Sequence, residues 1–295
     1  MVLSLALLAV VGHRCHQRYF SQQASILFWD VGQGDSQLIS LPFGKNYLLD
    51  TGGGRANRRI GNELFLELSR KGILRLQALL VSHPDEDHAS GALELFRHLV
   101  VDELWLHSGF KEEDRKSRLL TQLRADTKSR AIPIREFSST EVISGKNFHL
   151  KVVPLFSKKG VHSNNTVLVT ELEVYGCRFL FLGDLEKEGE MDLTRLIRPD
   201  VTVLKVGHHG SLTSSSLPFV RYLNPRYAII SVGQGNPYGH PRKEVIARFQ
   251  DQGAQVLRTD FHGYVEFKIS PEGKLACYNA LGSCGTYFCR QPETN

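Results

Sequence analysis

Residues 82–91 read SHPDEDHASG and place two histidines and three acidic residues within six consecutive positions. They follow LQALLV, a continuous apolar run of the kind that forms a buried strand. A compact turn after such a strand directs most of these polar side chains inward from one loop, whereas Glu86 is expected to face outward. The expected inward set is His83, Asp85, Asp87 and His88.

Polar residues also follow other apolar runs. Asp50 follows NYLL, Asp184 follows FLFLG, and the pair His208–His209 follows TVLKVG. Strand ends of this kind can share one edge of the sheets, where α/β folds bind ligands. Burial of unpaired carboxylates and imidazoles there would be costly, whereas a cation satisfies them together. An isolated His–Asp pair is more often a surface salt bridge or a helix cap, but a cluster joined by further strand ends predicts a metal site.

The ligand types narrow the choice of metal. Imidazole with carboxylate suits Zn²⁺ or Mn²⁺, and a higher share of oxygen ligands favours Mn²⁺. Asp184 comes from the opposite half of the chain and is expected to bridge two divalent ions. Two such ions would lower the pKa of a shared water and clamp a phosphoryl or acyl group in line.

The patterns of strands and helices repeat in the two halves of the chain. Apolar runs with glycine-rich turns at residues 25–54 predict an antiparallel meander, and the second half restarts with strands that include a hairpin turning at Tyr175–Gly176. After these strands, each half alternates apolar runs with helical patterns, which predicts βα units. We therefore expect an α/β fold, an αββα sandwich with two sheets face to face and helices outside.

The chain has 295 residues, and neither a short-period repeat nor a low-complexity linker divides it. We expect one domain at residues 25–270, preceded by a hydrophobic N-terminal segment (1–24) and followed by a C-terminal tail (271–295). The N-terminal apolar run is about a dozen residues long, short of the roughly 20 that span a bilayer. It predicts an export signal or a membrane stub, hence a membrane-associated or extracytoplasmic location. A buried core element, and a cytoplasmic location, are the alternatives.

Five cysteines contain no CxxC pair, which argues against a cysteine zinc site. Cys277, Cys284 and Cys289 crowd into the tail, whereas Cys15 and Cys177 stand alone in the sequence. Either the thiols are reduced, or the tail contains a disulfide, which would need an oxidising compartment. The net charge of +5 fits a polyanionic or anionic-lipid partner without requiring one.

Taken together, the motifs resemble the metallo-β-lactamase superfamily. HPDEDHASG is similar to its HxHxDH motif with Asp85 in place of the middle histidine, and LLDTGGG, FLGDL and VGHHGS resemble its first, fourth and fifth motifs. More narrowly, the ordered set FWDVGQGDS, HPDEDH, NNTVLV, LKVGHHGS and NPYGHP resembles the extracytoplasmic hydrolase domain of the ComEC DNA-uptake family, from about Ser25 to about Ile269. The third-motif histidine is missing, and Asn164 or Asn165 stands about where it would be. The resemblance implies a metallo-β-lactamase-like αββα sandwich.

The resemblance also implies roles for individual residues. The metal-binding residues that it carries over are His83, Asp85, Asp87, His88, Asp184 and His208. His209 is expected to contact substrate, or else to pack against the Gly210–Ser211 turn. The residues to which we assign catalytic roles are Asp87, His209 and His240.

The segment NPYGHP ends a strand on the same expected edge. Asn236 would hold a phosphate there, and His240 would help a leaving oxygen to depart. The alternative is an Asn-Pro turn with a buried Tyr238. Near the start of the domain, Asp35 and Ser36 would either orient a metal-binding histidine or cap a turn.

Three arginines, Arg55, Arg58 and Arg59, follow the first metal-site loop. Guanidinium groups bind phosphates bidentately, so we expect these arginines to contact the substrate. Lys205 and the basic helix at 116–130 would extend a positive track, although a solvated helix face is the favoured interpretation of that helix. Aromatic residues are not interleaved with these basic residues, so the sequence does not indicate base stacking.

The leading hypothesis is a metal-dependent phosphodiesterase or nuclease that acts on DNA, similar to the ComEC domain proposed to degrade the strand that is not taken up. It would use two divalent ions, Zn²⁺ or Mn²⁺. The enzymatic alternative is a hydrolase of small phosphoesters, esters or lactones. The non-enzymatic alternative is a metal-stabilised module that partners a membrane channel protein. The oligomeric state is left open.

Overall fold

The computed structural model describes residues 21–53, 59–110, 117–157 and 163–289. Two large sheets and one small sheet form the framework. In spatial order, the nine-stranded sheet contains β18 (Gly282–Phe288), β17 (Lys274–Asn279), β16 (Val265–Ile269), β1 (Ala24–Phe28), β2 (Gln37–Leu41), β3 (Lys45–Leu49), β5 (Ala78–Leu80), β7 (Leu104–His107) and β8 (Ile134–Phe137). The seven-stranded sheet contains β15 (Gln255–Arg258), β14 (Tyr227–Ile230), β13 (Val203–Lys205), β12 (Cys177–Phe181), β11 (Val167–Val174), β10 (Phe148–Leu155) and β9 (Glu141–Gly145). The small sheet pairs β4 (Arg75–Leu76) with β6 (Val100–Val101).

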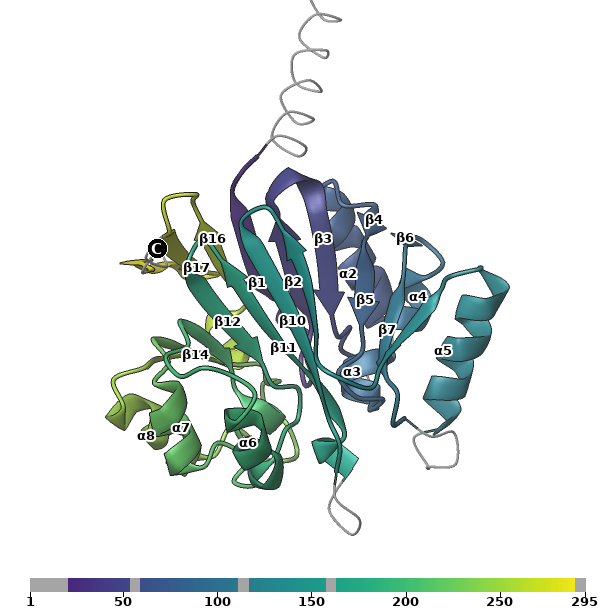
Figure 1. Ribbon diagram of the computed structural model, residues 1–295. Coiled ribbons are helices and arrows are strands. Elements are labelled where there is room, and N and C mark those ends of the chain that lie inside the picture. The colour runs from purple at the N-terminus through teal and green to yellow at the C-terminus, as the bar shows by residue number, and fades with distance from the viewer. Residues whose placement is uncertain (1–20, 54–58, 111–116, 158–162, 290–295) are drawn as a thin grey trace, which may run out of the picture.

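Helices cover the outer faces of the two large sheets (Figure 1). The helices beside the larger sheet are α2 (Ile60–Arg70), α3 (Glu86–Ala89), α4 (Ala92–Leu95) and α5 (Ser117–Ser129). Those beside the smaller sheet are α6 (Lys187–Thr194), α7 (Leu217–Leu223) and α8 (Lys243–Asp251). The short elements are α9 (Thr259–His262) and the 3₁₀ turns η1 (Pro42–Gly44), η2 (Ser163–Asn165) and η3 (Gly207–Gly210). The predicted αββα sandwich is confirmed.

The main core lies between the two sheets. Phe28 of β1 and Phe181 of β12 stack across it, with ring centroids 5.8 Å apart. Removing one such aromatic side chain from water contributes about 1.5–3 kcal/mol, so this layer fixes how the two sheets face each other. Two further apolar clusters lie under the helices, one outside each sheet.

Both halves of the chain follow the same strand plan. In the first half, the antiparallel strands β1, β2 and β3 lead into the parallel strands β5, β7 and β8. In the second half, the antiparallel strands β9 to β12 lead into the parallel strands β13, β14 and β15. The hairpin between β11 and β12 turns at Tyr175–Gly176, as predicted. Because parallel strands end at the same edge, each half delivers its polar strand ends to one rim.

The predicted C-terminal tail at 271–295 needs correction, because residues 274–288 continue the larger sheet. β17 pairs antiparallel with β16 and with β18, so the sheet extends past the expected boundary at residue 270. Burial alternates along β17, and the side chains of Leu275 and Cys277 pack into the core between the two sheets. The described part of this segment is therefore an integral edge of the domain.

Two disulfides fasten this edge. Cys277 pairs with Cys284 across the β17–β18 hairpin, and Cys289 pairs with Cys177 of β12. The alternative of a disulfide in the tail is thus confirmed over that of reduced thiols. Cys177, which stands alone in the sequence, belongs to a cross-link between the two sheets.

The predicted N-terminal segment at 1–24 falls largely outside the described residues, which begin at residue 21. Within the described ranges, the structure has no helix that is both long and apolar enough to cross a membrane.

Candidate metal centre

Five segments bring histidines and acids to one rim of the sandwich. Asp50 follows β3, His83 follows β5, and His88 lies in the short helix α3. Asp184 follows β12, and His209 lies in the η3 turn after β13. All five residues are buried, although all are polar. Such a buried polar cluster is stable only when its members are paired with one another or with a cation.

Hydrogen bonds at Nδ1 determine where two of the imidazoles point. His209 Nδ1 lies 2.8 Å from the carbonyl oxygen of Ser231, and His88 Nδ1 lies 2.9 Å from Asp50 Oδ2. Carbonyl and carboxylate oxygens only accept hydrogen bonds, so each Nδ1 carries the proton. A neutral ring held in this way presents an unprotonated Nε2, which is the form that binds metals.

A hydrogen bond from Nδ1 to Ser82 orients the ring of His83 in a similar way. The Ser82 hydroxyl donates its single proton to Asp50 Oδ2 at 2.7 Å, so its oxygen accepts from His83 Nδ1 at 3.1 Å. Asp50 Oδ1 accepts the backbone N–H of Ser82 at 2.7 Å. The Asp50 carboxylate therefore holds His88 directly and His83 through Ser82, and together with Asp35 and His88 it also forms one of the candidate ligand groups.

Asp184 lies between two sets of imidazoles. Its Oδ1 is 3.3 Å from His88 Nε2 and 3.5 Å from His209 Nε2. Its Oδ2 is 3.6 Å from His83 Nε2 and 3.8 Å from His208 Nε2. Oδ1 is buried and has no hydrogen-bond partner among the described residues. When these rings are neutral, each Asp184 oxygen faces lone pairs of nitrogen, and a cation supplies the missing attraction.

The remaining acids of the opening motif complete the donor set. Asp85 Oδ2 lies 3.7 Å from His83 Nε2, and Asp87 Oδ2 lies 3.4 Å from His209 Nε2. Glu86 is exposed, as predicted. The groups whose ligand atoms all lie within 4.8 Å of one another include His83, His88 and Asp184; Asp87, His88 and His209; and Asp35, Asp184 and His209. Nitrogen and oxygen donors of this kind would suit divalent ions such as Zn²⁺ or Mn²⁺, which these residues would hold.

The pKa shifts of Asp184 and His88 indicate that the cluster is more stable when it holds additional positive charge. Burial by itself would raise the pKa of Asp184, but the surrounding imidazoles of His209, His88 and His83 outweigh it and hold that pKa well below its usual range. Burial would lower the pKa of His88, yet the carboxylates of Asp184, Asp50 and Asp87 raise it well above its usual value. Protons on these rings stand in for the charge that a metal would bring.

A buried ion pair lies at the back of the cluster. Lys205 of β13 pairs with Asp35, and each side chain is only 1% exposed. Gly34 precedes Asp35 at a point where a Cβ atom would meet the Asp87 carbonyl oxygen at 2.2 Å, so only glycine allows this approach. Asp35 Oδ1 also lies 3.6 Å from His209 Nδ1. Lys205 is thus a buried counter-charge, which corrects the expectation that it extends an exposed basic track.

The structure also separates the roles of the two neighbouring histidines in VGHHGS. His209, expected to contact substrate or pack against a turn, lies in two of the candidate ligand groups. His208, predicted to be a ligand, has a side chain that is 24% exposed and lies in none of these groups. Its Nδ1 is 3.1 Å from Glu186 Oε1, a carboxylate that sequence reasoning did not single out. The ligand role predicted for His208 stays a prediction, and His209 is added to the ligand candidates.

The segment NPYGHP does not supply the phosphate contact expected of Asn236. The Asn236 side chain closes its own loop, since Nδ2 donates to the carbonyl of His240 at 2.7 Å and Oδ1 accepts the His240 N–H at 3.1 Å. Burial, reinforced by the nearby rings of His208 and His209, lowers the pKa of His240 to about 4. The catalytic role predicted for His240 stays a prediction. Tyr238 is exposed and not buried.

Of the three predicted phosphate-binding arginines, only Arg59 is described. It is exposed and directly precedes α2. Arg55 and Arg58 lie outside the described residues. Asn165, at the place of the missing third-motif histidine, is buried, and its Oδ1 accepts the backbone N–H of Glu186 at 3.1 Å.

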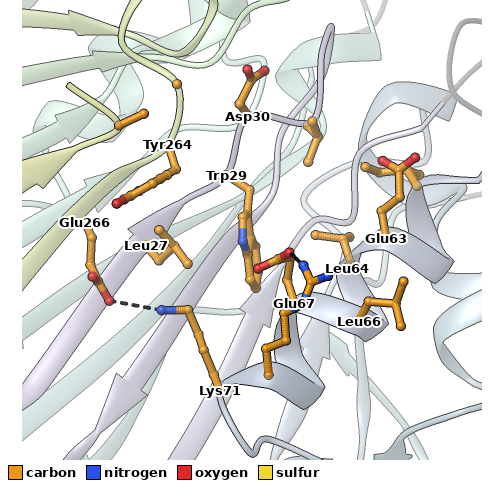
Figure 2. A pocket seen from close by; sticks show the side chains of 15 residues that line it. Leu27, Trp29, Asp30, Glu63, Leu64, Leu66, Glu67, Lys71, Tyr264 and Glu266 are labelled. Atoms are coloured by element: carbon orange, nitrogen blue, oxygen red, sulfur yellow. Dashed lines mark hydrogen bonds and ion pairs between the residues drawn. The ribbon is translucent and has the colours of Figure 1, made fainter.

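The described part of the structure contains two cavities of different character. A small one of about 380 Å³ is lined by loop residues that include Gln33, Gly53 and Gln234. A larger one of about 770 Å³ lies between α2 and the strands β1 and β16, and contains none of the candidate ligands. Figure 2 shows Trp29 and Tyr264 in its lining and the ion pair of Lys71 with Glu266 at one side. The larger cavity is therefore separate from the metal chemistry.

The sequence comparison agrees with the fold and the ligand set. A family model described as the metallo-beta-lactamase superfamily matches residues 29–234, more than half of the chain. The chain belongs to this superfamily, whose members are generally metal-dependent hydrolases and whose fold binds divalent metals, often two.

Among its relatives are competence proteins, which confirms the resemblance seen in the motifs. ComE operon protein 3 of Bacillus subtilis (strain 168) is 32% identical over 90% of this chain and 36% of its own length. Recombination protein 2 of Haemophilus influenzae is 32% identical over 80% of this chain and 28% of its own length. The chain thus spans about a third of the length of these relatives. Of solved structures, the metallo-beta-lactamase fold protein YhfI of Bacillus subtilis aligns with a TM-score of 0.54 over 82% of this chain and 99% of its own, at 12% identity, which shows the fold alone.

Proposed function

We propose that this protein is a metal-dependent phosphodiesterase, a nuclease that acts on DNA in connection with DNA uptake. The observation that carries the proposal is the position of the buried Asp184 carboxylate between imidazoles from both halves of the chain, within reach of a shared cation. Divalent ions bound there, Zn²⁺ or Mn²⁺, would activate a water and polarise a phosphoryl group. The competence-protein relatives support DNA as the substrate class.

The chain's own residues prepare this chemistry. Asp50 and Ser82 fix the rings of His83 and His88, so little reorganisation is needed when a substrate arrives. Asp184 holds the two halves of the ligand set at a common carboxylate. Arg59 offers an exposed cation near the first metal-site loop, where it can hold a phosphate.

We also propose that the domain works outside the cytoplasm in association with a membrane channel. The two disulfides support an oxidising compartment, because such bonds are rare in the reducing cytosol. The proposal of a membrane partner rests on the competence-protein relatives, of whose length this chain spans about a third.

The test is cleavage of labelled linear DNA by the purified protein, with and without Mn²⁺ or Zn²⁺. We expect metal-dependent cleavage that His83→Ala and Asp184→Ala abolish and that His149→Ala, a change at an exposed histidine of β10, leaves intact. Retained DNA binding by the inactive variants supports an enzyme. Absence of wild-type cleavage with either metal, together with DNA binding, would favour the non-enzymatic module.

Salt dependence distinguishes DNA from a small ester or phosphoester. Cleavage of DNA should weaken steeply as salt rises, because several phosphates are neutralised by the protein in the complex. A small-ester hydrolase should respond little. An activity that is insensitive to salt and limited to small esters would replace our proposal with the alternative.

A further inference from the structure

The loop at residues 236–242 is fastened to the turn that carries the metal candidates. The backbone N–H of Arg242 donates to the carbonyl of Gly210 at 3.0 Å, directly beyond His209. Two hydrogen bonds between Asn236 and His240 close the loop from within. A loop held at both places keeps its exposed side chains at a fixed position relative to the metal centre.

Three aromatic rings lead from solvent to Asp184 along this loop. The ring of Tyr238 lies nearly parallel to that of His240, with centroids 6.0 Å apart and an interplanar angle of 16°. The His240 ring lies 5.8 Å from that of His208, whose Nε2 is 3.8 Å from Asp184 Oδ2. Tyr238 is the outermost of the three rings and is 60% exposed.

A cation is bonded to the backbone of the residue that carries the outermost ring. Arg242 is exposed, and its Nη2 donates to the carbonyl oxygen of Tyr238 at 3.1 Å. An exposed ring and a guanidinium on the same loop form a combination with which proteins hold an unpaired base and an adjoining phosphate. The sequence did not indicate this combination, because it does not show whether Tyr238, which stands close to Arg242 in the chain, is exposed or buried.

We propose that Tyr238 is a stacking platform for an unpaired base of single-stranded DNA, next to the phosphate that enters the metal centre. Arg242 holds the neighbouring phosphate. The bases of an intact duplex stack on one another, so this platform selects single strands or frayed ends. The inference rests on the proposed function, since it names the form of DNA that the site takes.

The test compares a short single-stranded oligodeoxynucleotide with the same strand built from abasic residues. Tyr238→Ala should raise KM for the base-carrying strand about tenfold, because stacking is worth about 1–3 kcal/mol per base. Its kcat should change little, and KM for the abasic strand should not change. Tyr238→Trp, which keeps an aromatic ring at this position, should have the KM of the wild type. Tyr264→Ala, a matched change in the separate cavity of Figure 2, should have no effect.

The outcomes separate this inference from the proposed function. Equal KM values of the wild type and Tyr238→Ala on the base-carrying strand would overturn the inference while cleavage itself stands. An equal loss on the abasic strand would also overturn it, since the ring would then act only on the loop. If the wild type cleaves linear duplex DNA but neither single strand, the inference fails and the proposed function stands. If it cleaves none of these DNAs, the proposed function fails, and fluorescence anisotropy of the two single strands still tests whether Tyr238 recognises bases.

Discussion

The Nε2 atoms of His88 and His209 lie 3.3 Å apart, and the hydrogen bonds at their Nδ1 atoms leave both Nε2 atoms without a proton when the rings are neutral. Two lone pairs at this distance repel each other unless a cation or an added proton lies between them. The nearby Asp184 and Asp87 carboxylates make the need for positive charge greater. This relationship places both histidines at the same candidate ion.

A pair of neighbouring variants tests which histidine of the η3 turn binds metal. His209→Ala should lower the metal content by one ion per chain, because it removes an Nε2 that faces Asp87 and Asp184. His208→Ala is the matched control and should retain both ions. Elemental analysis after loading with Mn²⁺ or Zn²⁺ and desalting measures the difference. The reverse pattern would restore His208 as the ligand and contradict our assignment of His209.

Ser82→Ala should weaken metal binding without removing any ligand. The hydroxyl links Asp50 to His83 Nδ1, and loss of such supporting partners typically lowers metal affinity about 10- to 100-fold. Titration calorimetry with the metal gives the affinity directly. Ser144→Ala, which removes a hydroxyl bonded to the exposed His149, serves as the control. An unchanged affinity for Ser82→Ala would show that His83 is oriented by packing alone.

Lys205→Met should destabilise the fold strongly, because it leaves the buried Asp35 carboxylate without its counter-charge. Breaking a buried ion pair in this way costs about 3–5 kcal/mol. The double variant Lys205→Met/Asp35→Leu should recover much of this loss, since it removes both buried charges. Urea denaturation of the chelated proteins measures the free energies of unfolding. Additive losses in the double variant would mean that the two residues do not act as a pair.

Removal of the Cys177–Cys289 disulfide should lower the free energy of unfolding more than removal of Cys277–Cys284. The two bonds close loops with sequence separations of 112 and 7 residues. Chain entropy alone gives a contribution of about 5 kcal/mol for the longer loop and about 2 kcal/mol for the shorter. Paired Cys→Ala variants and thermal denaturation test this order. Equal losses would indicate that packing of the hairpin, rather than loop closure, sets the stability.

Stability should fall as the pH falls from about 6.5 towards 4, partly because of His107. Burial lowers the pKa of His107 to about 4, and its neutral ring accepts from Gly109 N–H at 2.8 Å and donates to the Leu155 carbonyl at 2.9 Å. Between the two pKa values the unfolded chain binds the extra proton, so this contribution is present above pH 6.5 and is lost on acidification. The expected loss is about 1–2 kcal/mol at pH 5 relative to pH 7.

The variant His107→Gln isolates this contribution. Its stability should vary less with pH than that of the wild type over the same interval, because glutamine does not titrate. Urea denaturation at several pH values gives both curves. Parallel curves for the two proteins would assign the acid sensitivity to other groups, such as His240, whose pKa is also lowered by burial.

The order of elements could be predicted from the sequence because hydrophobic period and turn residues are local signals. The meander before Asp50 and the hairpin at Tyr175–Gly176 follow from such signals. The edge hairpin at 274–288 was missed, because only its pairing with β16 shows that β17 and the largely exposed β18 extend the larger sheet. The link from Cys177 to Cys289 depends likewise on contact between the sheets.

By itself, the sequence determined the residue types at the strand ends: the acids and imidazoles of HPDEDH, Asp184 and the histidine pair all follow buried runs. Tertiary structure alone decided their division of labour. His208 and His209 are adjacent, and their left-handed backbone angles φ of 46° and 50° turn one ring towards the rim and the other into the cluster. Lys205 became a buried counter-charge because Asp35, far away along the chain, packs against it. The sequence states which residue types follow each strand. The orientation and burial of their side chains are set only when distant segments of the chain pack together.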